Sequence, residues 1–158
     1  MNFLPFFEWC YQTPVGETIR ESTWLFPLIE AFHLVGFGLT LGAVLLVDLR
    51  LLGAGLSRQP AAQLSDNAQP WILGGVTVMV LSGVPLFMSE SIKCYYSPAF
   101  WVKMTSLVLA LVFMFTFRRH AMRTGLTSDR PPVARVTALI SLCLWFGVAW
   151  GGRWIGFS

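Results

Sequence analysis

Three ionisable side chains lie within long hydrophobic stretches of the sequence, where a charge is costly and by default marks a functional site. Glu30 and His33 belong to the first stretch, and Lys103 belongs to the third. Residues three apart share one face of a helix, so the Glu30 carboxylate can orient the His33 imidazole as the partners of metal-ligating histidines do. The spacing predicts an acid, a base and a cation that form one catalytic cluster inside the membrane.

His33 is the candidate metal ligand of this cluster, because neutral imidazole is a common ligand and proton carrier. We expect it to ligate haem iron or to assist a redox or proton-transfer site. The only other histidine, His120, follows two arginines and is expected at the opposite membrane face. Met79 is predicted at a similar depth in the second stretch and is the candidate sixth ligand, although a gap-filling role in the core is the favoured explanation.

A purely structural alternative remains open for the same residues. If the first and third stretches enter the membrane near Trp24 and Ala99, Glu30 lies roughly 9 Å deep and Lys103 roughly 6 Å deep, at about 1.5 Å per residue. These two side chains can then form a buried ion pair, while His33 forms a hydrogen bond with a neighbouring helix.

The elements that must position these residues follow from the composition. Of the 158 residues, 55% are hydrophobic and 12% are charged, whereas about a quarter are charged in soluble domains. We predict an all-α integral membrane four-helix bundle, a single domain over residues 1–158, in contact with the lipid bilayer. The spans are expected at about 24–52, 71–88, 99–117 and 133–155, and residues 1–23 are expected to form an interfacial segment.

Positive charges predict the orientation of the bundle, because short cytoplasmic loops are rich in arginine and lysine. Arg20, Lys93 and Arg153 are expected on one side of the membrane. Seven arginines are expected on the other side, namely Arg50, Arg58, Arg118, Arg119, Arg123, Arg130 and Arg135. Both termini are therefore predicted to be periplasmic. The net charge of +3 reflects this topology and does not indicate a nucleic-acid partner.

Small and polar residues predict contacts between the helices. Gly38 with Gly42, and Gly147 with Gly151, are pairs of the kind that lets membrane helices approach closely. They predict that the first and fourth spans are neighbours. Asp48, near the cytoplasmic end of the first span, is expected to pair with the arginine cluster.

Cysteines offer one covalent link. Cys10 and Cys94 are both expected on the outer side, where a disulfide can persist and would hold the N-terminal segment over the bundle. Cys143 lies within the fourth span and is expected to be an inert small hydrophobic residue.

Two runs of the sequence resemble a known superfamily. They are EAFHLVGFGLTLGAVLLVDLRLLG in the first span and FWVKMTSLVLALVFMFTFRRH in the third. They are similar to the copper-resistance D-type superfamily, which includes small bacterial membrane protoporphyrinogen oxidases of the HemJ type. The resemblance implies a bacterial inner-membrane protein that binds b-type haem, with His33 and Lys103 at functional positions. The chain departs from the oxidases in having no histidine inside the third span and PPVARV at the start of the fourth.

The leading functional hypothesis is an inner-membrane protein that binds haem b or a porphyrin through His33 and is redox-active. Lys103 would contact a propionate or a substrate carboxylate, and the protein would be a protoporphyrinogen-oxidase-like enzyme or a haem-dependent oxidoreductase. The alternative is a non-enzymatic subunit or anchor of a larger membrane complex, with a membrane-protein partner or a second copy of the chain. A copper or small-solute transporter is less favoured, because only the first span offers a strong pair of ligands.

Overall fold

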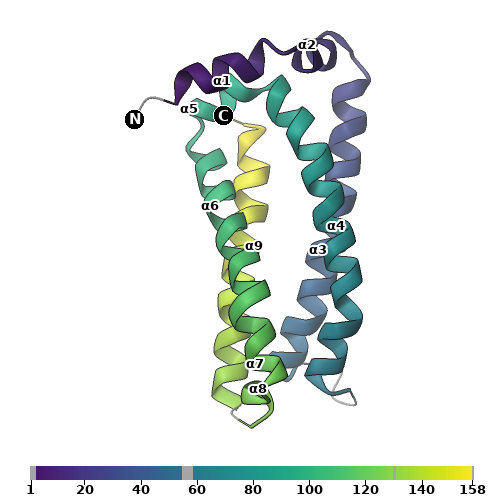
Figure 1. Ribbon diagram of the computed structural model, residues 1–158, viewed down its shortest axis with the longest axis vertical. Helices are drawn as coiled ribbons and strands as arrows, with labels where there is room; N and C mark the ends of the chain where they lie inside the picture. The colour runs from purple at the N-terminus through teal and green to yellow at the C-terminus, as the bar shows by residue number, and fades with distance from the viewer. Residues whose placement is uncertain (1–2, 55–58, 130, 158) are drawn as a thin grey trace.

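The chain folds into a bundle of long helices with two short helices lying across one end (Figure 1). The structure is a computed structural model and describes residues 3–54, 59–129 and 131–157. Four segments are long and apolar enough to cross a membrane: α3 (Leu25–Leu52), α4 (Ala61–Ser89), a third span over Pro98–Arg123, and α9 (Pro131–Ile155). They confirm the predicted all-α four-helix membrane fold, and within the described ranges no strand is formed.

The second span is longer than predicted. The sequence predicts a start at residue 71, but α4 begins ten residues earlier and continues through Pro70. A helix of 29 residues is about 43 Å long, whereas the hydrocarbon core is about 30 Å thick. The polar turns from Ala61 onward therefore project beyond the hydrocarbon, where water can satisfy the carbonyl that Pro70 leaves without a donor. Arg58 and Arg130 of the arginine set lie outside the described residues.

The third span is not one regular helix. It consists of α6 (Pro98–Phe113), a π-helical turn η1 (Met114–Arg118) and α7 (Arg119–Arg123), followed by the short α8 (Leu126–Asp129). The helical structure therefore continues past residue 117, where the sequence predicts the span to end. A π-helical turn inserts an extra residue into the helix and is frequent at functional sites.

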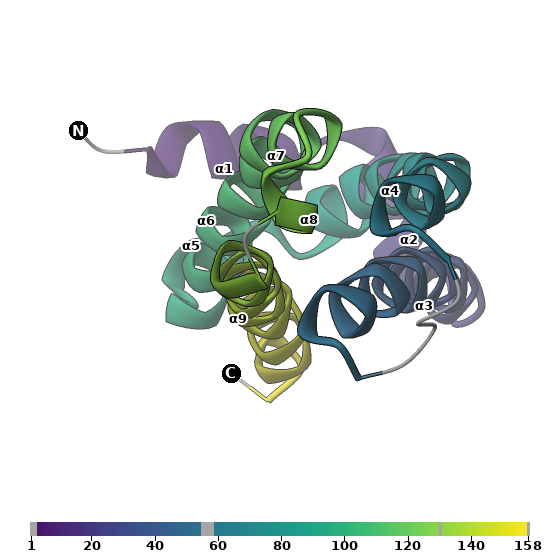
Figure 2. The same cartoon turned by 90° about the horizontal axis from the view of Figure 1, so that it is seen from below.

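The spans pack as two helix pairs, α3 with α4 and α6 with α9, which are joined through α3 and α9 (Figure 2). No comparable packing joins α4 to α6. In the most hydrophobic 18-residue stretch of the third span, only 11% of the residues are buried, against 28 to 33% in the corresponding stretches of the other three spans. The third span is therefore the least buried of the four within the bundle.

Glycines allow the close helix contacts, but not all of the predicted ones do so. A Cβ added to Gly75 of α4 would lie 2.7 Å from the carbonyl oxygen of Gly36 in α3. A Cβ on Gly151 of α9 would lie 2.8 Å from a carbonyl oxygen of α6. A Cβ on Gly38 or Gly42 would have no neighbour within 4 Å in the described chain. The first and fourth spans are neighbours, but the expectation that Gly38 and Gly42 mediate this contact is wrong, because these residues lie on the outer face of α3.

The N-terminal helices α1 (Leu4–Tyr11) and α2 (Pro14–Glu21) lie across the end of the bundle where α3 begins (Figure 1). Phe7 is buried in an aromatic cluster with Phe87, Tyr95 and Phe100. The Arg20 guanidinium donates to the carbonyl oxygens of Ser89 (3.0 Å) and Tyr11 (2.7 Å). These contacts fix α1 and α2 to the ends of α4 and of the short α5 (Ser91–Tyr96).

Candidate functional site

His33 lies on the face of α3 that packs against α4, and its imidazole is half-buried. Its Nδ1 is 3.0 Å from Ser82 Oγ, and Ser82 Oγ donates its own hydrogen to the Val78 carbonyl oxygen at 2.6 Å. When the hydroxyl gives its one hydrogen to the Val78 carbonyl oxygen, its own oxygen accepts from His33 Nδ1–H. This tautomer leaves the lone pair on Nε2, the nitrogen that is available to bind a metal.

The sequence of α4 shapes the wall against which this ring lies. A Cβ on Gly83 would lie 3.2 Å from His33 Cε1, so the glycine lets the imidazole approach the helix closely. Met79 lies three residues before Ser82, on the same face of α4, and is buried. The structure thus places His33, Ser82 and Met79 along the contact between α3 and α4.

Lys103 reaches the same end of the bundle from α6. Its backbone lies against α9, because a Cβ on Gly151 would be 2.9 Å from the Lys103 nitrogen. Lys103 lies six residues into α6, near the end of the bundle where α3 begins. In the described part of the chain no carboxylate lies within ion-pair distance of its ammonium group.

Glu30 does not join His33 and Lys103. Its side chain is exposed, and no ion pair of Glu30 is formed among the described residues. The expected pairing of Glu30 with Lys103 is therefore not made, and Ser82 takes the orienting role expected of Glu30. Residues three apart differ by about 60° around a helix, which here is enough to turn Glu30 outward while His33 faces α4.

A second polar centre lies toward the opposite end of the bundle. Asp48 Oδ1 of α3 is 3.3 Å from Arg118 Nη2 of the π-helical turn, and the two side chains are 0% and 3% exposed. Arg118 Nη1 also donates to Ser141 Oγ of α9 at 3.4 Å. The prediction that Asp48 pairs with the arginine cluster is confirmed, but the pair is buried between three helices and not placed at the rim.

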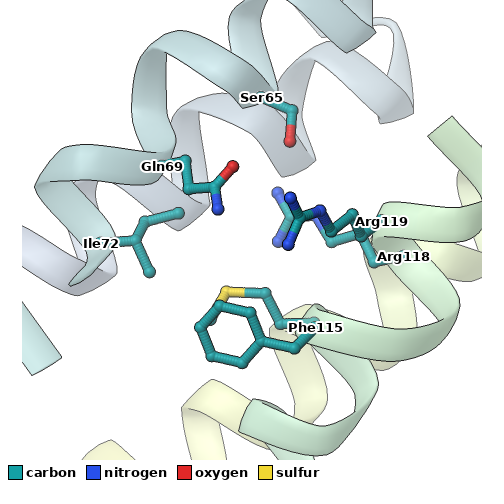
Figure 3. A pocket seen from close by; sticks show the side chains of 7 residues that line it. Ser65, Gln69, Ile72, Phe115, Arg118 and Arg119 are labelled. Carbon is teal, nitrogen blue, oxygen red and sulfur yellow. The ribbon is translucent and has the colours of Figure 1, made fainter. Parts of the chain in front are cut away.

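A small pocket lies beside this ion pair (Figure 3). It has a volume of about 30 Å³ and is lined by Ser65, Gln69, Ile72, Met114, Phe115, Arg118 and Arg119. The guanidinium groups extend from the third span toward the Ser65 hydroxyl and the Gln69 amide of α4 (Figure 3). Sequence reasoning missed this pocket because residues before 71 were assigned to a linker. The spacing of Ser65, Gln69 and Ile72, which share one helix face, was the signal that could have revealed it.

The two outer cysteines are buried and free, so the expected disulfide between Cys10 and Cys94 is not formed. Burial raises the pKa of the Cys94 thiol to about 11, although Lys103 partly opposes the shift. Burial also raises the pKa of Cys10. Among the described residues no three His, Cys, Asp or Glu side chains come together as a metal site.

Comparisons with known proteins place the chain in a family. No curated protein and no solved structure matches it. The profile of a family of unknown function (DUF6644) matches residues 6–158. The match includes all four spans and every residue of the two polar centres, so the chain belongs to the DUF6644 family.

Proposed function

We propose that this protein is a multi-pass protein of the bacterial inner membrane that binds b-type haem, or a related porphyrin, through Nε2 of His33. The supporting observation is the hydrogen bond between His33 Nδ1 and Ser82 Oγ, which holds the ring and, with Nδ1 as the donor, leaves the Nε2 lone pair for a metal. Metal-ligating histidines almost always have such a partner on the other nitrogen. A porphyrin supplies four nitrogens to its iron, so one imidazole is sufficient to hold it.

Lys103 supports the same proposal. It is a cation inside the membrane, has no carboxylate partner among the described residues, and lies at the same end of the bundle as His33. A propionate of haem, or a carboxylate of a porphyrin substrate, would supply the missing negative charge. Met79 is the candidate sixth ligand, since methionine is a known axial partner. The resemblance to the copper-resistance D-type and HemJ-like proteins points to the same cofactor.

Bound haem would supply one-electron redox chemistry, and we propose an oxidoreductase role on that basis. In this proposal His33 binds the iron, Ser82 orients the imidazole and Lys103 orients the cofactor by a carboxylate. The apolar side chains of the spans exclude water from the site. Glu30 remains a candidate only for a partner outside the chain, because its side chain is exposed.

A haem titration of the purified apoprotein in mild detergent tests the proposal. The wild type should bind one haem per chain with a Soret band, and His33→Ala should lose it. Ser82→Ala should bind about 10- to 100-fold more weakly, the usual effect of removing the partner of a ligating histidine, while Ser82→Thr should keep most of the affinity. His120→Ala is the matched control and should bind as the wild type does. Equal binding by the wild type and His33→Ala would overturn the proposal.

We also propose that both termini are periplasmic. The two ends of the described chain lie at one end of the bundle (Figure 1), and the arginine-rich loop between the third and fourth spans lies at the other. Arginine-rich loops remain in the cytoplasm. A C-terminal alkaline phosphatase fusion, which is active only in the periplasm, should be active; an inactive fusion at normal expression would contradict this orientation.

A second candidate function is a subunit or anchor of a larger membrane complex. The weak burial of the third span favours it, because an apolar helix face can be covered by a partner as well as by lipid. Purification from native membranes in a mild detergent should then recover a stoichiometric protein partner. His33→Ala should leave that association unchanged.

A further inference from the structure

The pocket beside the buried ion pair is built from groups that recognise anions. Ser65 and Gln69 lie four residues apart on one face of α4 and provide a hydroxyl and an amide. Arg118 and Arg119 extend toward them from the third span (Figure 3). Guanidinium groups are the preferred partners of phosphate oxygens, because they present several N–H donors in a planar fork.

The Arg118 guanidinium is incompletely satisfied within the chain. The residue is 2% exposed. Its Nη1 donates to Ser141 and its Nη2 is ion-paired with Asp48 Oδ1 at 3.3 Å, while Nε has no hydrogen-bond acceptor among the described residues. Buried donors without an acceptor are costly. Because Arg118 lines the pocket, an acceptor in the pocket could complete its hydrogen bonding.

The charges around the pocket favour an anion over water alone. Asp48 balances Arg118, but Arg119 has no carboxylate within ion-pair distance in the described ranges. Asp66 follows Ser65 directly, is exposed and does not line the pocket. Water can accept from Arg118 and hydrate the exposed Arg119, but only an anion would add a Coulombic attraction to this second guanidinium.

The position of the pocket indicates where such an anion comes from. Ser65 lies four residues after the start of α4 and Arg118 lies five residues before the end of the third span, so both lie near a membrane interface. Ile72 and Phe115 make part of the wall apolar. The same two helices carry exposed apolar side chains, such as Leu73 of α4 and Val112 of α6. A phosphate at the pocket could therefore carry acyl chains along these helices.

From these observations we infer that the pocket formed by Ser65, Gln69, Arg118 and Arg119 binds a phosphate oxyanion, and that its source is the headgroup of an anionic phospholipid. Basic pockets between helices at the cytoplasmic side are a known mode of lipid recognition. The pocket is distant from His33 along the bundle, so the inference does not depend on haem binding.

Native mass spectrometry of the delipidated full-length protein tests the inference. Phosphatidylglycerol is the probe, and diacylglycerol with the same acyl chains is the control lipid that lacks the phosphate. We expect the wild type to retain one phosphatidylglycerol and no diacylglycerol. Arg119→Gln and Gln69→Leu should each weaken binding about five-fold, which corresponds to about 1 kcal/mol. Arg123→Gln removes the same charge from an exposed position outside the pocket and should bind as the wild type does.

Inorganic phosphate separates the two sources of the oxyanion. If the lipid is the ligand, millimolar phosphate should leave phosphatidylglycerol bound. If phosphate alone binds in an Arg119-dependent way and no lipid is retained, the oxyanion site stands and the lipid source is wrong. Equal weakening by Arg119→Gln and Arg123→Gln, or no binding of either probe, would overturn the inference, because only general charge or ordered water would then occupy the pocket.

Discussion

Removing one partner of the Asp48–Arg118 pair should destabilise the bundle far more than removing both. The charged atoms are 3.3 Å apart and almost fully buried, and at an effective dielectric constant of about 20 their attraction is about 5 kcal/mol. Asp48→Leu leaves a buried guanidinium without its counter-charge, and Arg118→Met leaves a buried carboxylate without its own. Each single substitution should cost about 3 to 5 kcal/mol, whereas the double substitution by apolar residues should cost much less.

Unfolding in mixed micelles with increasing sodium dodecyl sulfate, followed by circular dichroism, measures the four free energies of this double-mutant cycle. Arg123→Met is the matched control, since it removes an exposed arginine from the same segment, and its effect should stay within about 0.5 kcal/mol. If the double substitution lost the sum of the two single losses, the two charges would not be coupled and the reasoning would fail.

Three further predictions concern packing and the thiols. Gly75→Ala should destabilise the protein by about 1 to 3 kcal/mol in the same unfolding assay, because its Cβ would press on the Gly36 carbonyl oxygen, while Gly38→Ala should be neutral because its Cβ meets nothing within 4 Å in the described chain. Phe7→Ala should cost about 3 to 5 kcal/mol and expose the N-terminal helices to limited proteolysis, whereas a substitution at an exposed aromatic of α1 should not change the cleavage pattern. Burial raises the pKa of Cys94 to about 11, so the folded protein keeps the thiol protonated at pH values where the unfolded chain would lose the proton. The stability that depends on the protonated Cys94 thiol should therefore be complete below the ordinary thiol pKa and be lost as the pH rises toward 11. Alkylation of Cys94 in the folded protein should accordingly remain slow at pH 8 and accelerate toward pH 11, and rapid labelling at pH 8 would contradict its burial.

The membrane fold could be predicted from the sequence because the hydrocarbon core imposes length and hydrophobicity on each span. The ends of the spans could not, since nothing in the hydrophobic pattern requires a helix to stop at the hydrocarbon boundary. The hydrophobic pattern therefore predicts a span that begins at residue 71, whereas the helix α4 begins at Ala61. Ser65 and Gln69 lie before residue 71, so the sequence pattern provided no reason to expect them in a pocket between helices.

Of the polar side chains, the sequence identified those that lie within spans but not all of their partners. His33 and Lys103 lie at the same end of the bundle, as their depths predicted. The three-residue spacing predicts that Glu30 joins the same cluster, because it puts two side chains near one face of a helix. The rotation of α3 about its axis depends on its packing against α4, and the spacing of two residues within α3 cannot predict that packing. The orienting partner of His33 is an uncharged serine, for which the sequence carried no distinct signal.

The contacts of small residues could also be predicted only in part. Several glycines occur at four-residue spacing, and only packing decides which of them face a neighbour. Gly147 and Gly151 are in close contact with α6 and not with the first span as predicted, whereas Gly38 and Gly42 lie on an open face. The pairing of Asp48 with an arginine could be predicted because a carboxylate in a span needs a counter-charge, although the sequence alone does not tell which arginine of the cluster it contacts.

The absorption spectrum of purified His33→Gly, with and without added imidazole, tests the role of His33 most directly. Removing the side chain leaves space next to Ser82 that free imidazole can enter. We predict that the wild type purified from haem-replete cells shows a Soret band, that His33→Gly lacks it, and that imidazole restores it. A colourless wild-type protein, or a His33→Gly protein that retains the wild-type spectrum without imidazole, would contradict haem ligation by His33.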